Sequence, residues 1–176
     1  YRTNAQSRSL EDMFIRLGIP YKIYGGVRFY DRKEIKDIVA YMRFIFQPED
    51  SVSFERIANI PTRSIGDISL LRFRSWRQLS GISMLDALAR IDDCPNLTPK
   101  AKSGIKDVND IVVSFRSQME TMSVPMFLDA LIKRIGYLKF LDDGSIQGDS
   151  RIENVRELLS VAKGYADNNL AGFLEE

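Results

Sequence analysis

Ile60-Pro61-Thr62-Arg63-Ser64-Ile65-Gly66-Asp67 is the stretch around which the rest of this sequence is organised. Its proline ends one segment, a basic turn with a glycine follows, and we expect Asp67 to cap the next helix. A helix N-terminus exposes unpaired N–H groups and the positive end of the helix dipole, so with Arg63 beside it the turn is a candidate phosphate site. An ordinary corner between two helices has the same local pattern, and this stretch alone favours the corner.

The composition limits the classes of protein to consider. With 176 residues the chain can bury one sizeable core, and its hydrophobic content of 44% is ordinary for a globular protein. The formal net charge of +1 means that any nucleic-acid surface must be local. A single cysteine, Cys94, excludes an internal disulfide framework and fits a reducing compartment. No apolar run approaches the roughly 20 residues of a membrane-spanning helix.

The sequence contains no complete set of catalytic residues. There is no histidine, so the commonest general base and the commonest metal ligand are both missing. No glycine-rich phosphate loop of the G-x-x-x-x-G-K-[ST] form is present. Paired carboxylates occur only in predicted loops or at the end of the chain, where they are usually solvated. We therefore predict no catalytic residue, no metal site and no bound cofactor within this chain.

Hydrophobic periodicity predicts a mainly α fold of seven or eight helices with one short strand. Helices are expected over 10–17, from 31 to about 46, near 51–58, over 68–80, from 84, from 99, over 124–135 and over 151–165, and one more is expected to begin at 170. The strand is expected at 19–24. The acidic, glycine-bearing segment 142–150 is expected to be a mobile loop.

Local signals mark where these helices begin and end. Asp31 and Glu34 have the spacing of a capping box, and Thr98 precedes a proline at the first helical position. Further N-caps are expected at Asp50 or Ser51, at Ser83 and at Ser123, and helix-ending glycines at 18, 81 and 136.

Two groups of basic residues are candidates for nucleic-acid binding. Arg74 and Arg77 share a face of the helix that follows the opening stretch, and we expect Arg63 to reach the same end of that helix. The group also contains Arg72 and Trp76, and a second group comprises Lys100, Lys102 and Lys106. Nucleic-acid backbones are bound mainly by such phosphate contacts. A solvated helix face with Trp76 in the core is the alternative, and composition leaves both open.

Four segments resemble motifs of one family, the UvrD/PcrA/Rep group of superfamily 1 DNA helicases. YRTNAQSR at 1–8 resembles motif IV, and GGVRFYDRKEIKD at 25–37 resembles the segment that follows it. IPTRSIG at 60–66 is similar to the V-P-x-R-G-I-G stretch, and RIENV at 151–155 to R-x-E-N-(L/V). The motifs occur in family order from end to end of the chain, and the PcrA/UvrD branch is the most similar.

The resemblance implies a domain organisation and an activity. Residues 1–30 would be a helix–strand piece of the second RecA-like α/β motor domain, 2A, and residues 31–176 the helical 2B subdomain, cut short at its C-terminus. The parent would be an ATP-dependent 3′→5′ DNA helicase that binds ATP and Mg²⁺ through motifs outside this chain. Implied partners are duplex DNA with a single-strand junction, the rest of the motor and repair proteins, in the bacterial cytoplasm at the nucleoid, with no membrane. A protein-interaction or autoinhibitory module without direct DNA binding remains the alternative.

The resemblance also implies roles for single residues. Arg2 and Asn4 match motif IV residues near single-stranded DNA. Arg63, Ser64, Ile65 and Gly66 match a turn whose backbone amides hold duplex phosphates, while Arg28, Arg32, Glu34 and Lys36 fall in a segment expected to hold the junction with the motor. One departure concerns Ser64, because the family usually has glycine there. If that position needs a positive φ, serine carries a steric cost, although its hydroxyl can add a phosphate contact.

Overall fold

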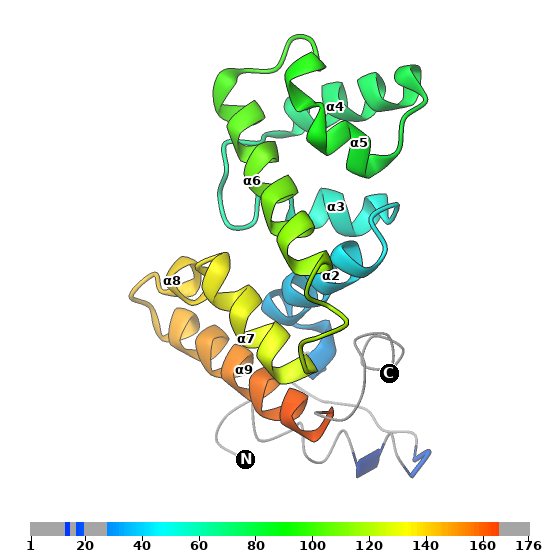
Figure 1. The fold of residues 1–176 in the computed structure, drawn as a ribbon. Coiled ribbons are helices and arrows are strands. Elements are labelled where there is room, and N and C mark those ends of the chain that lie inside the picture. The colour runs from blue at the N-terminus through cyan, green and yellow to red at the C-terminus, as the bar shows by residue number, and fades with distance from the viewer. Residues whose placement is uncertain (1–12, 15–16, 20–27, 166–176) are drawn as a thin grey trace.

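The structure is a computed structural model that describes residues 13–14, 17–19 and 28–165. Within these residues the secondary structure is helical, which confirms the predicted mainly α fold (Figure 1). The α-helices are α2 (Lys33–Phe46), α3 (Ser51–Ile57), α4 (Asp67–Ser80), α5 (Met84–Ala89), α6 (Pro99–Arg116), α7 (Val124–Arg134), α8 (Tyr137–Leu141) and α9 (Ile146–Ala162). Short 3₁₀ helices are η2 (Phe29–Asp31), η3 (Ile91–Asp93) and η4 (Lys163–Tyr165).

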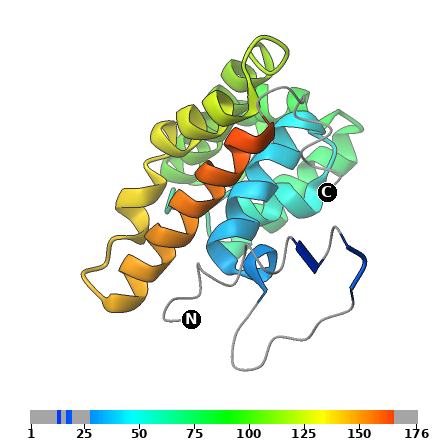
Figure 2. The same cartoon turned by 90° about the horizontal axis from the view of Figure 1, so that it is seen from below.

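Helix α6 joins the two ends of the molecule. In Figure 1 it runs from the end that carries α4 and α5 toward the end that carries α7, α8 and α9. It packs against α5, α2 and α7. Figure 2, seen from below, shows α9 lying between α2 and α7, and both of these helices contact it. The α3–α4 turn is therefore placed at one side of a continuous helical body.

The core is centred on α2. Its predicted inward residues Ile35, Ile38 and Met42 are fully buried, and Val39 packs at the edge of the core. Each fully buried aliphatic side chain contributes roughly 1.5–3 kcal/mol of transfer free energy. Phe29 is also fully buried in this core, so the helical body includes a residue on the N-terminal side of the predicted 30/31 domain boundary. The boundary itself stays a prediction.

Most predicted helix ends are confirmed. The side chains of Asp50, Ser83 and Thr98 accept hydrogen bonds from backbone N–H groups three residues on, at the N-termini of α3, α5 and α6. Gly18, Gly81 and Gly136 all have φ near +60°, in the left-handed region that ends helices. Ser123 is the N-cap of α7 but makes no side-chain capping bond.

The predicted capping box at the start of α2 is wrong. Arg32, not Asp31, is the N-cap, and no side chain caps this end. Asp31 instead lies in η2 and pairs with Lys36 at 2.8 Å. Glu34 is buried and accepts a 2.6 Å hydrogen bond from the amide of Asn154. Its burial against α9 explains why it does not turn back to cap its own helix.

Two further boundaries differ from prediction. Gly66, not Asp67, is the N-cap of α4. Helix α9 starts at Ile146, within the predicted loop, because the Ser145 hydroxyl accepts from the N–H of Gly148 at 2.9 Å. A Cβ on Gly148 would lie 2.9 Å from the Leu141 carbonyl oxygen, so this glycine serves close packing rather than a loop. The predicted helix from 170, residues 20–24 of the predicted strand and motif IV lie outside the described residues.

Candidate nucleic-acid interface

The turn between α3 and α4 is held from inside by one asparagine. Asn59 accepts hydrogen bonds through its side-chain oxygen from the backbone N–H of Arg63, at 2.7 Å, and of Ile65, at 3.2 Å. Ile65 itself is buried, with 1% of its surface exposed. Its predicted role in DNA binding can therefore involve only the path of the backbone and not its side chain.

Arg63 points into the protein. Its Nε donates to the Asp107 carboxylate at 2.7 Å, and its Nη1 donates to the carbonyls of Ile57, Ile60 and Pro61 at 3.0–3.3 Å. Only 8% of the side chain is exposed. The sequence suggested a cation beside the phosphate, but this guanidinium is engaged in fixing the shape of the turn.

Asp107 on α6 accepts from two arginines. Arg134, at the end of α7, donates to its other carboxylate oxygen at 2.8 Å. Burial opposes the charge of Asp107, yet the hydrogen bonds and charges of Arg63 and Arg134 hold the pKa of this carboxyl below its usual range. Two cations share one anion, so a net positive charge remains at the base of the turn. Arg134 is the more accessible of the two, with 43% of its side chain exposed.

Ser64 and Gly66 form the exposed side of the turn. Ser64 has φ +60°, the left-handed conformation that the family glycine would adopt without a steric cost. Gly66 is extended, with φ −86° and ψ 171°, and no side chain caps the helix behind it. Within the described part of the chain, the N–H groups of Ser64 and Gly66 make no hydrogen bond. Exposed N–H groups before an uncapped helix N-terminus are suited to an anion.

A glycine on α6 sets the position of the turn. A Cβ on Gly104 would lie 2.4 Å from the carbonyl oxygen of Arg63 and 3.0 Å from the side chains of Arg63 and Ile65. No other residue type fits this contact without displacing the turn.

The sequence did not identify Asn59, Gly104 and Asp107 as residues of this site. A glycine within a helical pattern and single polar residues give no sign of a contact with residues distant in the sequence.

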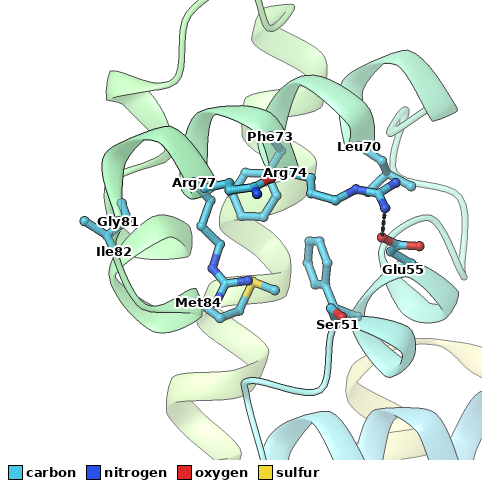
Figure 3. A pocket seen from close by; sticks show the side chains of 11 residues that line it. Ser51, Glu55, Leu70, Phe73, Arg74, Arg77, Gly81, Ile82 and Met84 are labelled. Carbon is cyan, nitrogen blue, oxygen red and sulfur yellow. Dashed lines mark ion pairs between the residues drawn. The ribbon is translucent and has the colours of Figure 1, made fainter.

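Arg74 and Arg77 do share a face of α4, as predicted, but that face is turned toward α3 (Figure 3). Arg74 pairs with Glu55 at 3.2 Å, and Arg77 pairs with Glu49. Arg63 does not join them, because it points toward α6. The three arginines predicted to act together are thus divided between two places.

Most of the remaining aromatic and basic candidates also make internal contacts, whereas Lys100 is exposed. Trp76 is partly buried and packs against Phe73, with ring centroids 6.2 Å apart, which supports the core interpretation. Lys106 pairs with the Asp92 carboxylate, and Lys102 donates to the Asp92 carbonyl oxygen, both at 2.7 Å. Arg2 and Asn4 lie outside the described residues.

A buried polar network joins α2 to α9 through the predicted RIENV motif. Asn154 accepts from Arg32 Nη1 at 2.8 Å and donates to Glu34 Oε1 at 2.6 Å. Beside it, Asp37 accepts from the Tyr137 hydroxyl and from Arg56 Nε, both at 2.8 Å. Asn154 is therefore a structural residue that connects the first long helix to the last.

Two kinds of site are absent from the described residues. No three His, Cys, Asp or Glu side chains among them gather in a way that could hold a metal ion. None of the helices in the described ranges has the length and apolarity needed to cross a bilayer.

Comparison with known proteins gives consistent matches over the whole chain. A family model described as the UvrD-like helicase C-terminal domain matches residues 1–175. The chain is 35% identical over 181 residues to the ATP-dependent DNA helicase PcrA of Bacillus subtilis (strain 168), covering 100% of this chain and 24% of the relative. The PcrA helicase of Staphylococcus epidermidis is 39% identical over 169 residues, and that of Staphylococcus aureus 36%. The chain spans about a quarter of the length of these curated relatives.

Proposed function

Since this chain belongs to the family of UvrD-like helicase C-terminal domains, as its four motifs predicted, we propose that it forms part of an ATP-dependent DNA helicase and contributes a contact to duplex DNA. In this proposal the whole protein unwinds DNA in the 3′→5′ direction in the bacterial cytoplasm, with ATP and Mg²⁺ bound outside the 176 residues. Residues 1–30 belong to the motor and 31–176 to the inserted subdomain. Arg2 and Asn4 remain proposed contacts to the single strand.

The observation that carries the proposal is the pair of free N–H groups on the α3–α4 turn. The amides of Ser64 and Gly66 have no partner in the described residues, and the N-terminus of α4 behind them has no capping side chain. A phosphate oxygen seated there accepts from the backbone, and Ser64 is itself exposed at this turn. Contacts of this kind bind the backbone of any sequence, as an unwinding enzyme requires.

The structure changes the role proposed for Arg63. Because its guanidinium is occupied by Asp107 and three carbonyl groups, Arg63 supports the turn from behind. The cation that assists phosphate binding is instead Arg134, the exposed partner of Asp107. Arg74 and Arg77 lie on the face of α4 toward α3, and we propose that they add at most a secondary electrostatic contribution.

Asp67 opposes phosphate binding at this turn. It is exposed in the first turn of α4, where its carboxylate complements the helix dipole but repels a phosphate. Substitutions at Asp67 therefore test whether a backbone N–H at this end of α4 binds a phosphate. Proline is favoured at the first helical position, and the extended Gly66 before it is compatible with proline. Asp67→Pro and Asp67→Ala therefore both lose the carboxylate, and only the proline variant also loses an N–H.

The experiment measures fluorescence anisotropy of a labelled duplex with a 3′ single-stranded tail, titrated with the full 176-residue chain at low salt. Asp67→Ala is expected to tighten binding about two- to five-fold by removing a like charge from the helix N-terminus. If the N–H of residue 67 donates to a phosphate, the Asp67→Pro variant, which lacks this N–H, should bind about ten-fold more weakly than the Asp67→Ala variant. The affinity for the duplex should fall as the salt concentration rises. A plot of log affinity against log salt concentration should have a slope of about −1 for each phosphate contacted.

Two outcomes would count against the proposal. Equal affinities for the alanine and proline variants would show that the N–H of residue 67, the first of the uncapped N-terminus of α4, does not hold the DNA. No binding by the unmodified chain in about 50 mM salt would remove the duplex contact altogether, since non-specific phosphate binding is strongest there.

A second candidate function, a protein-docking module, is favoured by one observation on α4. Ile68, Leu71 and Leu79 occur at helical spacing and are 58–89% exposed. Such a stripe suits a partner helix or the motor itself. Self-association measured by sedimentation that persists in high salt and disappears in Leu71→Glu, together with no DNA binding at low salt, would favour docking over the duplex contact.

A further inference from the structure

A cavity of about 320 Å³ opens between α3, α4 and the start of α5 (Figure 3). Its apolar wall contains Phe54, Phe73 and Met84, each at most 3% exposed. The two phenyl rings lie 5.3 Å apart at an interplanar angle of 41°. Leu70 and Ile82 extend the apolar surface, and the polar residues at its margin are Ser51, Glu55, Arg74, Arg77 and Gln78.

The size and the lining together restrict what can enter. Ligand pockets typically measure about 300–1,000 Å³, so this cavity is at the small end of the range and suits a single ring system. The charges at its margin are matched, since Glu55 pairs with Arg74 and Glu49 pairs with Arg77. An apolar group without a net charge is therefore favoured over an anion.

One polar atom at the cavity lacks a partner. Arg77 Nε is buried and makes no hydrogen bond within the described residues. A buried donor left without an acceptor costs roughly 1–3 kcal/mol, so a change that pairs it is favourable. The Arg77 side chain is 24% exposed, whereas the apolar wall is fixed in the core. Arg77 is thus the part of the lining that can adjust and give its N–H to an entering group.

We propose that this α3–α4 pocket binds a small uncharged aromatic molecule that carries one hydrogen-bond acceptor. The ring lies against Phe54, Phe73 and Met84, and the acceptor, such as an amide carbonyl oxygen, takes the N–H of Arg77. The pocket joins the two helices on either side of the turn, but its lining includes none of residues 58–66. The inference therefore stands apart from the proposed DNA contact.

The test uses methyl NMR of the 176-residue chain labelled with ¹³C at its methionine methyl groups. Met84 lies in the pocket, and Met126 on α7 is 62% exposed and reports non-specific binding. Three probes are titrated separately: indole-3-acetamide, indole, and indole-3-acetate. We expect indole-3-acetamide to shift the Met84 methyl signal saturably below about 10 mM and to leave Met126 unchanged. Indole should bind about five-fold more weakly, because it lacks the acceptor.

Two variants separate the polar and apolar parts of the site. Arg77→Met keeps an apolar stem and removes the N–H, so it should lower the affinity for indole-3-acetamide to that for indole. Ile82→Trp fills the cavity and should abolish saturable shifts of both probes. Arg90→Met is the matched control, because Arg90 is exposed and pairs with Asp93 outside the pocket.

Four results would overturn the inference, and the first three concern the Met84 signal and the Arg77 variant. These are the absence of a saturable Met84 shift with every probe, equal shifts at Met84 and Met126, and unchanged affinity in Arg77→Met with the methyl spectrum of a folded chain. Tighter binding of indole-3-acetate than of indole-3-acetamide would show that the pocket selects an anion, contrary to the proposal.

Discussion

The carbonyl oxygen of Arg63 lies so close to Gly104 that a Cβ on this glycine would come within 2.4 Å of it. A backbone oxygen cannot swing away as the end of a flexible side chain can. The contact therefore ties the α3–α4 turn to α6 and fixes where the exposed N–H groups of Ser64 and Gly66 lie. A substitution more than 30 residues away in sequence should consequently alter the proposed DNA contact.

Gly104→Ala is expected to destabilise the chain by about 1–2 kcal/mol. The overpacked contact costs roughly 1–3 kcal/mol, and the higher helix propensity of alanine offsets part of this. Urea denaturation measures the change, and anisotropy with the tailed duplex should show weaker binding under conditions where the variant is folded. Ser103→Ala, at the exposed neighbouring position, should change neither quantity appreciably. A Gly104→Ala chain with unchanged stability would mean that the turn is not seated on α6 in this way.

Ser64→Gly is expected to stabilise the chain by about 0.5–1 kcal/mol. The left-handed conformation costs a non-glycine residue roughly 1–2 kcal/mol, and the greater freedom of glycine in the unfolded chain returns part of that gain. Urea denaturation again provides the measurement. Ser75→Gly in the exposed middle of α4 is the matched control and should be destabilising by about 0.5 kcal/mol. The same sign for both variants would contradict a positive φ at Ser64.

Asn154→Ala should destabilise the chain by about 2–3 kcal/mol. The change removes two buried hydrogen bonds to charged groups, one from Arg32 and one to Glu34. Asn154→Asp can still accept from Arg32 but cannot donate to Glu34, so its stability at neutral pH should be no higher than that of the asparagine. Thermal or urea unfolding measures both variants.

Glu153→Ala is the control for this pair, because Glu153 is the neighbouring residue in the same helical turn and is exposed. A loss in Asn154→Ala no larger than that in Glu153→Ala would show that the link between α2 and α9 contributes little to stability.

The sequence was sufficient for the helical framework because its signals are local. The apolar stripe of α2 and the caps at Asp50, Ser83 and Thr98 depend on residues at most one helical turn away. The start of α9 was missed because its glycine and polar residues are typical of a loop. Its first turn is capped by the Ser145 hydroxyl and packs closely against the end of α8 at Gly148, and periodicity contains neither contact.

The candidate site was predictable only in its backbone. The family glycine at position 64 raised the question of a positive φ, and Ser64 does have φ +60°, because chain geometry at a tight turn is a local property. The direction of Arg63 was not predictable, since Asp107 lies 44 residues further along the chain and nothing local marks it as a partner. Charge patterns identify cations, but only packing decides whether a cation faces solvent.

Asp107→Asn is expected to lower the free energy of unfolding at neutral pH. It is also expected to make this free energy fall less as the pH is lowered. The pKa of Asp107 is lower in the folded chain than in the unfolded chain, so its contribution is present above the unfolded value and is lost as pH falls toward the folded value. Because 38% of its side chain is exposed, screening limits the expected loss at pH 7 to about 1–2 kcal/mol.

Urea unfolding at several pH values between about 7 and 2 covers this window. The difference in stability between the two chains should shrink as the pH falls below about 4, where unfolded aspartate becomes protonated. Asp110→Asn, one turn along the exposed side of α6, is the matched control. A stability difference for Asp107→Asn that stays constant across this range would show that the carboxylate charge between Arg63 and Arg134 does not stabilise the turn.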